Sequence, residues 1–289
     1  MKNKMNILLL LLVFFLGLAI ILYPLVSNFV NSKNQSQAIT AYDSAVASSQ
    51  GEDYSRLFAA AAAYNRKLRD LPCPWSDYEQ IAGYEDLLSL GNCKVMARIS
   101  IDKIAVDLPV YHGSSEAVLN IGAGHLQGSS LPVGGTGSHT ALTAHRGLPS
   151  ARLFTDLNRL EPGDTFKLTV LDRDLTYRIE EISTVAADDL DRLSILPGED
   201  LCTLFTCTPY GINTHRLLVR GKRLPAADLA AASDRQDAAD RDPGSKVTGS
   251  LRPYNSDLVL LLTLIFASVL LVRLVCLLVR YKKLHDQHK

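Results

Sequence analysis

The sequence predicts a mainly β domain, a closed barrel or a sandwich, with an N-terminal helical lead-in and two flanking transmembrane helices. Between residues 95 and 224, short β-branched and apolar runs are separated by Gly, Pro and Asp, with no helical pattern between them. Residues 35–70 instead repeat apolar side chains at three- and four-residue steps, as an amphipathic helix does. Apolar runs near both ends are long enough to cross a bilayer.

The first apolar run extends from Ile7 to Val26 and follows Lys2 and Lys4. About 20 residues are needed to span the hydrocarbon of a bilayer. A secretory signal peptide is the alternative, but its apolar stretch is usually about 7 to 15 residues and precedes a cleavage site with small residues. Because this run is longer and no such site follows it, we favour an uncleaved anchor, with residues 1–31 forming a cytoplasmic tip and a transmembrane helix.

The second apolar run extends from Leu258 to Val279 and is interrupted only by Arg273. Lys2 and Lys4 precede the first run, and Arg280, Lys282 and Lys283 follow the second. The positive-inside rule therefore places both termini in the cytoplasm. We expect a protein of the cell membrane with two spans, in which residues 258–289 form the second span and a cytoplasmic tail. The domain between the spans is then extracellular.

The region between the two spans changes character along the chain. The lead-in, residues 32–94, contains the helical pattern Tyr54, Leu57, Phe58, Ala61, Tyr64 and Leu68, and Gln50-Gly51 separates this helix from an earlier one. Two prolines, Pro72 and Pro74, exclude a regular helix or a central strand after it. The β domain follows at 95–224, and residues 225–257, rich in Ala, Asp, Ser, Gly and Pro, are expected to form a flexible linker.

Composition excludes several classes of function. The chain carries 30 basic and 30 acidic residues, so its charge gives no indication of nucleic-acid binding. Its five cysteines form no CxxC pair, which argues against a structural zinc site and against a disulfide framework. The glycines of 122–128 have the wrong spacing for a dinucleotide-binding turn. We therefore expect no metal, no cofactor and no nucleic-acid partner.

Three side chains in the β region could carry covalent chemistry. Cys207 ends a β-branched run, Arg216 lies in the run that follows the breaks at Pro209 and Gly211, and His145 ends an earlier run. A thiolate is a nucleophile, an imidazole carries its proton, and the guanidinium fork can hold an oxyanion. These three groups on adjacent strands would suit acyl transfer.

The alternation of strand side chains predicts which residues accompany them. Counting in steps of two, Cys207 shares a face with Thr203 and Phe205. Arg216 shares one with Leu218, while Leu217 and Val219 point the other way. We therefore expect a cleft floor made of two strands.

Each of these residues also has an ordinary structural alternative. A strand cysteine is often a buried small apolar group, and an isolated Arg is usually a solvated surface charge. Spacing alone does not select the histidine, because His139 shares strand parity with His145. The other competing histidines are His112, His125 and His215.

The pattern Thr-Leu-x-Thr-Cys at 203–207, with Arg216 after it and His145 before it, closely resembles the sortases. The resemblance covers residues 95–224 and includes the segments Ser100–Ile104, Leu108–Gly113, Gly122–Gly135, Thr143–Phe154 and Leu204–Arg223. It implies a closed eight-stranded sortase-type β-barrel in which Cys207, His145 and Arg216 are catalytic. It also implies cleavage of an LPxTG-like sorting signal after Thr, a thioester on the cysteine, and transfer to an amine.

The lead-in and the C-terminal span resemble class C sortases, the pilus polymerases. In that class a lid carrying an acidic residue, Pro and an aromatic residue covers the cleft. Pro74 and Trp75 match the last two, but Cys73 stands where the acidic residue is expected. Either Asp70 or Asp77 is an alternative partner for the catalytic Arg, and Trp75 is otherwise expected to pack on the barrel wall.

The resemblance therefore implies a membrane-anchored cysteine transpeptidase, a thiol peptidase and acyltransferase. Its expected partners are the lipid bilayer, pilin or surface-protein substrates with an LPxTG-like motif, and the lysine amine of the next pilin. One alternative is a cell-wall-anchoring enzyme that uses a peptidoglycan-precursor amine. Another is a non-catalytic scaffold that binds sorting signals.

Overall fold

The computed structural model describes residues 2–49, 54–91 and 93–225, together with residues 265, 268, 269, 272, 273 and 276. Two compact units make up the chain, one from Met1–Ser27 with Asp234–Lys289 and the other from Asn28–Ser233. Most of the predicted linker and of the predicted second span lies outside the described residues.

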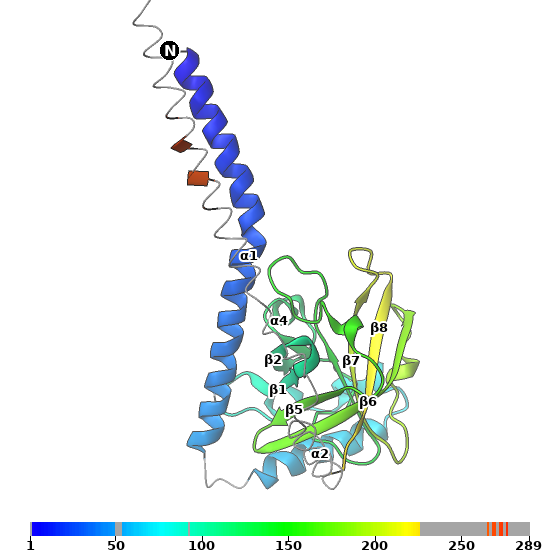
Figure 1. Cartoon of the computed structure of the whole chain (residues 1–289). Helices are drawn as coiled ribbons and strands as arrows, with labels where there is room; N and C mark the ends of the chain where they lie inside the picture. Colours follow the sequence, from blue (N-terminus) through cyan, green and yellow to red (C-terminus); the bar gives the residue numbers. More distant parts are fainter. Residues whose placement is uncertain are drawn as a thin grey trace, which may run out of the picture. The chain divides into compact units, whose positions relative to one another are not determined.

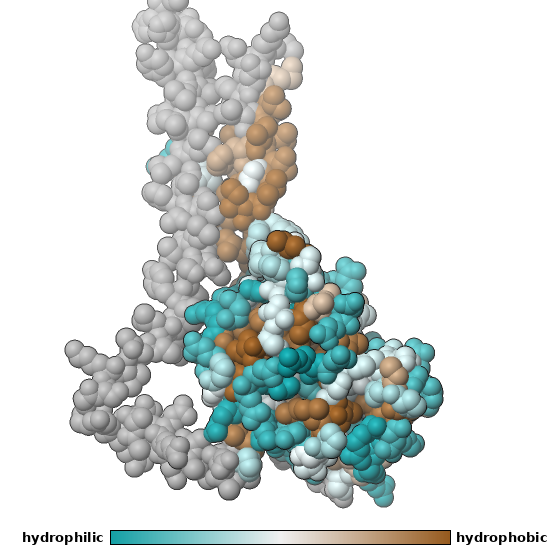
Figure 2. Space-filling view, turned by 90° about the vertical axis from the view of Figure 1, so that its right-hand side faces the viewer, coloured by the Kyte–Doolittle hydropathy of each residue, from teal (hydrophilic) through white to brown (hydrophobic). Residues whose placement is uncertain are grey.

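Helix α1, Lys2–Ser48, begins in the predicted anchor and continues into the lead-in, with Pro24 inside it. Its part from Leu11 onward is long and apolar enough to cross a membrane. Among the described residues, no other helix meets both conditions. Figure 2 shows apolar side chains covering the N-terminal part of α1. Helix geometry therefore continues through residues 31 and 32, where the sequence predicted the boundary between anchor and lead-in.

The last part of α1 packs on the β domain. Ile39 and Tyr42 are buried. The hydroxyl of Tyr42 accepts a hydrogen bond from the backbone N–H of Leu171 at 2.6 Å and donates one to the carbonyl of Met96 at 3.3 Å. Tyr42 thus joins α1 to two separate parts of the β domain, at Met96 and at Leu171.

Helix α2, Ser55–Arg69, buries the side chains of Phe58, Ala61, Tyr64 and Leu68. These four belong to the apolar pattern that predicted the helix, and they join the main core. Helix α1 ends at Ser48 and helix α2 begins at Ser55, which is consistent with the predicted separation of two helices.

Eight strands form a closed barrel (Figure 1). The order around the barrel is β1-β2-β3-β4-β7-β8-β6-β5, in which β2–β3 and β4–β7 are parallel. This confirms the closed eight-stranded barrel. The strands are β1 Val95–Ile101, β2 Val106–His112, β3 Ala123–His125, β4 Ser138–Thr143, β5 Thr165–Val170, β6 Arg173–Ala186, β7 Asp200–Thr208 and β8 His215–Arg223. The short helices are α3 Pro74–Asp77, α4 Glu116–Leu119 and the 3-10 turns Tyr78–Gln80, Tyr84–Asp86, Asp102–Ile104, Leu157–Arg159 and Asp191–Leu193.

The interior of the barrel is packed with side chains. Phe166 of β5 and Tyr177 of β6 stack with ring centroids 5.4 Å apart. A Cβ atom on Gly221 of β8 would lie 2.7 Å from the Phe166 ring, so this position has room only for glycine. Leu204 and Val219 add to the same core from β7 and β8.

His125 of β3 is buried in this core, and its environment makes stability depend on pH. Its Nε2 lies 2.9 Å from the carbonyl of Ser130 and its Nδ1 lies 2.9 Å from the Tyr84 hydroxyl. Burial lowers the pKa of His125 from 6.5 to about 4. The folded protein therefore keeps this imidazole neutral at pH values where the unfolded chain protonates it.

The stabilisation from His125 is thus complete above pH 6.5 and is lost as the pH falls toward 4. Between pH 7.5 and 5 we expect a loss of about 2 kcal/mol in the free energy of unfolding from this residue. Urea unfolding at both pH values should show a smaller loss for His125→Gln than for the unmodified chain. The exposed residue His215 serves as control, and His215→Gln should keep the full pH dependence. Equal pH dependence in the unmodified chain and His125→Gln would contradict the assignment.

Candidate active site at the ends of β4, β7 and β8

Cys207 and Arg216 lie directly opposite each other on antiparallel strands β7 and β8, as Cα partners in the ladder. The strands are joined by residues 209–214, where Pro209 and Gly211 interrupt the β pattern. Both side chains are partly buried. The hairpin therefore fixes the thiol and the guanidinium on neighbouring strands near their connecting loop.

His145 reaches the same place from β4, which runs parallel to β7 with Thr143 opposite Phe205. The Thr206 hydroxyl donates a 2.7 Å hydrogen bond to the carbonyl of Ala144, so the chain is still fastened to β7 where it leaves β4. The carbonyl of His145 accepts a hydrogen bond from the backbone of Phe154 at 3.1 Å. The structure thus brings together the three backbone positions predicted to be catalytic. In the described part of the chain, no hydrogen bond joins their side chains to one another.

The guanidinium of Arg216 is held by its own loop. Its Nη1 donates to the carbonyls of Asn213 and His215, each at 3.1 Å. Among the ion pairs of residues 54–91 and 93–225, none involves Arg216. The Nε and Nη2 donors therefore remain for a ligand, because the guanidinium has five N–H groups.

The strand face that carries Cys207 points away from the barrel interior and is apolar. A small cluster of Ala141, Leu193 and Leu218 is packed with Trp75, Leu126, Val185, Leu190 and Phe205. Phe205 precedes Cys207 by two residues and Leu218 follows Arg216 by two, so they lie on the same strand faces. Leu204, Leu217 and Val219 belong to the barrel core instead. The predicted division of the two faces is confirmed, and this outer cluster forms an apolar surface beside Cys207.

The predicted lid lies on this surface. Pro74 occupies the first position of the one-turn helix α3, where its missing N–H costs nothing. Trp75 belongs to the outer cluster, and a Cβ on Gly128 would lie 2.9 Å from its ring. The tryptophan therefore packs on the barrel wall. It lies in the outer cluster, on the face of the barrel that also carries Cys207.

Cys73 is exposed at the start of the lid. Its backbone N–H donates to Oδ2 of Asp77 at 3.2 Å, and the Ser76 hydroxyl donates to Oδ1 of Asp77 at 3.2 Å. Asp77 thus closes the lid turn on itself and does not pair with Arg216.

The competing histidines are engaged elsewhere. His139 is buried, with Nδ1 2.9 Å from the carbonyl of Ser194 and Nε2 2.7 Å from the Thr203 hydroxyl. Burial lowers its pKa to about 4. His112 contacts the carbonyl of Leu87 through Nε2 at 2.8 Å, and His125 lies in the core. His215 is exposed and adjoins Arg216, so strand alternation points it to the opposite face.

Two residues that fasten the segments on either side of the lid were not identified from the sequence. Asn65 of α2 donates to the carbonyl of Leu131 at 3.0 Å and accepts from its N–H at 2.7 Å. After the lid, the Tyr84 hydroxyl accepts from the backbone N–H of Gly113 at 2.9 Å. Neither contact has a periodic or motif signal, since each joins residues at least 29 positions apart.

Among the described residues, neither a metal site, nor the large pocket, nor the second thiol of β7 coincides with Cys207. No group of three or more His, Cys, Asp or Glu in this part of the chain could hold a metal ion. A pocket of about 800 Å³ is lined by residues that include Glu85, Cys93 and His112, and it contains none of the three predicted catalytic residues. The thiol of Cys202 is enclosed in the core, and burial raises its pKa. Cys207 is the partly exposed thiol of β7.

A closed barrel with Cys and Arg paired on one hairpin, and His on the neighbouring strand end, defines a class of cysteine acyl-transfer enzyme. Residues 99–224 match the Sortase domain family. The crystal structure of sortase C1 from Streptococcus agalactiae is 45% identical, with a TM-score of 0.62, covering 65% of this chain and 98% of that chain. The chain belongs to the sortase family, whose members are cysteine transpeptidases.

Two further relatives bear on the branch of the family. A structure described as a pilus-related sortase C of Group B Streptococcus is 42% identical, with a TM-score of 0.53, covering 60% of this chain and 89% of that chain. Sortase A of Streptococcus agalactiae is 29% identical over 147 residues, which are 50% of this chain and 58% of that protein. The chain thus spans about three fifths of the length of this relative.

Proposed function

We propose that this protein is a membrane-anchored transpeptidase that cleaves an LPxTG-like sorting signal after Thr and transfers the acyl group to a pilin lysine amine. The observation that carries the proposal is the direct pairing of Cys207 with Arg216 beside the chain position of His145. The similarity to a structure named as a pilus-related sortase C supports pilin as the substrate.

The chemistry follows from the three side chains. The Cys207 thiolate attacks the carbonyl carbon of the Thr residue, forming a C–S bond while the N–H donors of Arg216 bind the oxyanion. His145 then gives a proton to the leaving amine as the C–N bond breaks, which leaves a thioester. The lysine amine attacks this thioester, loses a proton to His145 and releases the thiolate.

The location of the protein is part of the proposal. The first span is supported by the apolar first part of α1. The second span and the cytoplasmic position of both termini rest on the sequence, from Leu258 to Val279 and the Lys and Arg residues outside the spans. The barrel is then extracellular and close to exported substrates.

A peptide-adduct experiment tests this function. The full chain is incubated with an LPxTG-containing peptide and analysed by mass spectrometry before an amine is added. We expect the acyl fragment on Cys207 and its release onto a lysine peptide. Peptide binding without an adduct would instead support a non-catalytic scaffold, and release only onto a peptidoglycan-precursor amine would support cell-wall anchoring.

We also propose that Trp75 covers Cys207 as part of a lid. Replacing Trp75 by Ala removes the ring from the apolar cluster, and the lost burial should speed thiol labelling of Cys207 about tenfold or more. Labelling is measured by mass spectrometry as a function of time. Trp75→Phe keeps an aromatic ring and should label at nearly the rate of the unmodified chain. An unchanged rate in Trp75→Ala would refute the lid role.

A further inference from the structure

Helix α1 is fastened to the end of the barrel that carries Cys207. Oδ1 of Asn28 accepts a hydrogen bond from the backbone N–H of Arg152 at 3.0 Å, and Nδ2 of Asn31 donates one to the carbonyl of Ser150 at 2.8 Å. Both partners lie in the loop that follows His145. At its other end this part of α1 reaches the β5–β6 turn through Tyr42. The unit thus begins, at Asn28, beside its candidate active site.

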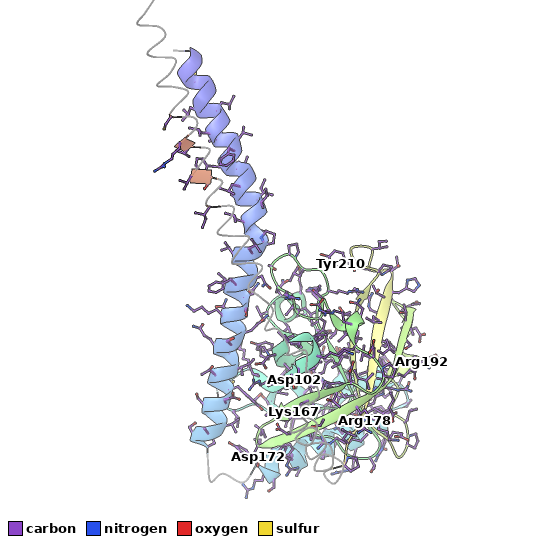
Figure 3. The ribbon with its side chains drawn as sticks, viewed as in Figure 1. Asp102, Lys167, Asp172, Arg178, Arg192 and Tyr210 are labelled. Carbon is purple, nitrogen blue, oxygen red and sulfur yellow. The ribbon has the colours of Figure 1, made fainter. Side chains whose placement is uncertain are left out.

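The loop between β7 and β8 adds exposed apolar side chains to this same end. Tyr210 is 62% exposed and Ile212 is 67% exposed. The Tyr210 ring rests on Gly147, two residues after His145, where an added Cβ would lie 2.5 Å from the ring. Figure 3 shows Tyr210 at one end of the barrel and Asp172, of the β5–β6 turn, at the other.

The three segments that meet at this end contain no carboxylate of their own, but carboxylates lie beside them. Residues 27–42, 144–155 and 209–215 have no Asp or Glu, although the chain has 30 of them in 289 residues. Of their cations, Lys33 is exposed, Arg146 donates to the Thr208 hydroxyl at 3.0 Å, and Arg152 pairs with Asp156 at 2.6 Å. Asp107 and Asp156 line one pocket together with Asn28 and Arg152.

We propose that this end of the barrel, formed by residues 28–33, 146–152 and 209–215, rests on the surface of the phospholipid bilayer. The inference depends on the proposed anchoring of the first apolar run, which ends at Val26. Asn28 is two residues further on, at most about 7 Å along the chain. The loop bonded to Asn28 therefore lies close to the membrane, whichever direction the apolar helix takes.

The exposed side chains of Tyr210 and Ile212 suit the region where a bilayer meets water. Tyrosine is enriched where membranes meet water, because its ring is apolar and its hydroxyl is polar. On this surface, Cys207 lies near the plane of the membrane.

Fluorescence quenching by brominated lipid tests the proposal with the full chain. In a Trp75→Phe background, which removes the single native Trp, Ile212→Trp and Leu196→Trp are each reconstituted into vesicles of phosphatidylcholine and phosphatidylglycerol. Leu196 is 42% exposed and lies before β7, away from Cys207. We expect brominated acyl chains to quench the fluorescence of the 212 variant and to leave that of the 196 variant unchanged.

Equal quenching at both positions, or no quenching at 212, would overturn the proposal that this surface rests on the membrane. If fluorescence at 212 changes with protein density in the vesicles and not with bromination, the membrane proposal is overturned, and a second copy of this chain covers the surface instead. Tyr210→Trp, a conservative change, gives the same readout if the 212 variant folds poorly. The peptide-adduct experiment on the unmodified chain in the same vesicles keeps the two questions apart. An adduct without quenching refutes only the membrane surface, and quenching without an adduct refutes only the proposed function.

Discussion

Replacing Cys207 by Ala is expected to abolish formation of the acyl adduct, with a fall in turnover of at least about 10⁴-fold. The reason is that neither His145 nor Arg216 can supply the sulfur to which the acyl group is transferred. The adduct is measured by mass spectrometry, and turnover by release of the peptide fragment. Because the side chain is partly exposed beside a loop, we expect the variant to remain folded.

Cys202 provides a matched control on the same strand. It lies five residues earlier on β7, on the opposite face, and is fully buried in the barrel core. Cys202→Ala should lose some stability through the removed volume and still form the adduct on Cys207. An adduct that persists in Cys207→Ala, or that disappears in Cys202→Ala while the protein stays folded, would contradict the assignment.

The second large effect is expected for Arg216→Lys, which keeps the positive charge and removes the planar fork. Lysine has no second nitrogen with which to satisfy the carbonyls of Asn213 and His215 and still reach an oxyanion. Loss of one oxyanion donor costs roughly 100-fold to 1,000-fold in turnover. We expect a fall of this size in the rate of thioester formation, with peptide binding changed much less.

Arg178→Lys is the control for this substitution. Arg178 lies on β6, is exposed and faces Lys222 in the ladder. Its replacement should leave the rate of thioester formation unchanged. An Arg216→Lys variant that retains full activity would show that a charge alone is sufficient and that the fork geometry is not used.

Much of the barrel could be predicted because strand signals are local. β-branched runs ending at Gly, Pro or Asp mark strands such as β5 and β7, and alternation alone separates Phe205 and Leu218 from Leu204 and Val219. The parallel contact between β4 and β7 is different, since these strands are about 60 residues apart in sequence. The pattern of residues did not predict this contact.

The choice among histidines shows the same limit. His139 and His145 have the same parity on β4, so periodicity alone left both open. Two buried hydrogen bonds, to Ser194 and Thr203, enclose His139, and they come from segments that the strand pattern does not connect. Asn65 and Tyr84 were missed for a related reason, because a single polar contact across the fold leaves no periodic trace.

The closed order of the strands limits how a substrate can be recognised. β7 is hydrogen-bonded to β4 on one side and β8 on the other, and β8 is hydrogen-bonded to β7 and β6. Along β7 up to Phe205, where both edges are paired, an extended peptide therefore cannot join the sheet as an additional strand, because neither edge offers free N–H and C=O groups. Selection among peptides must come from side chains such as Phe205 and from the surrounding loops, and changing these regions could alter which peptide is accepted while leaving the Cys207–Arg216 pairing intact.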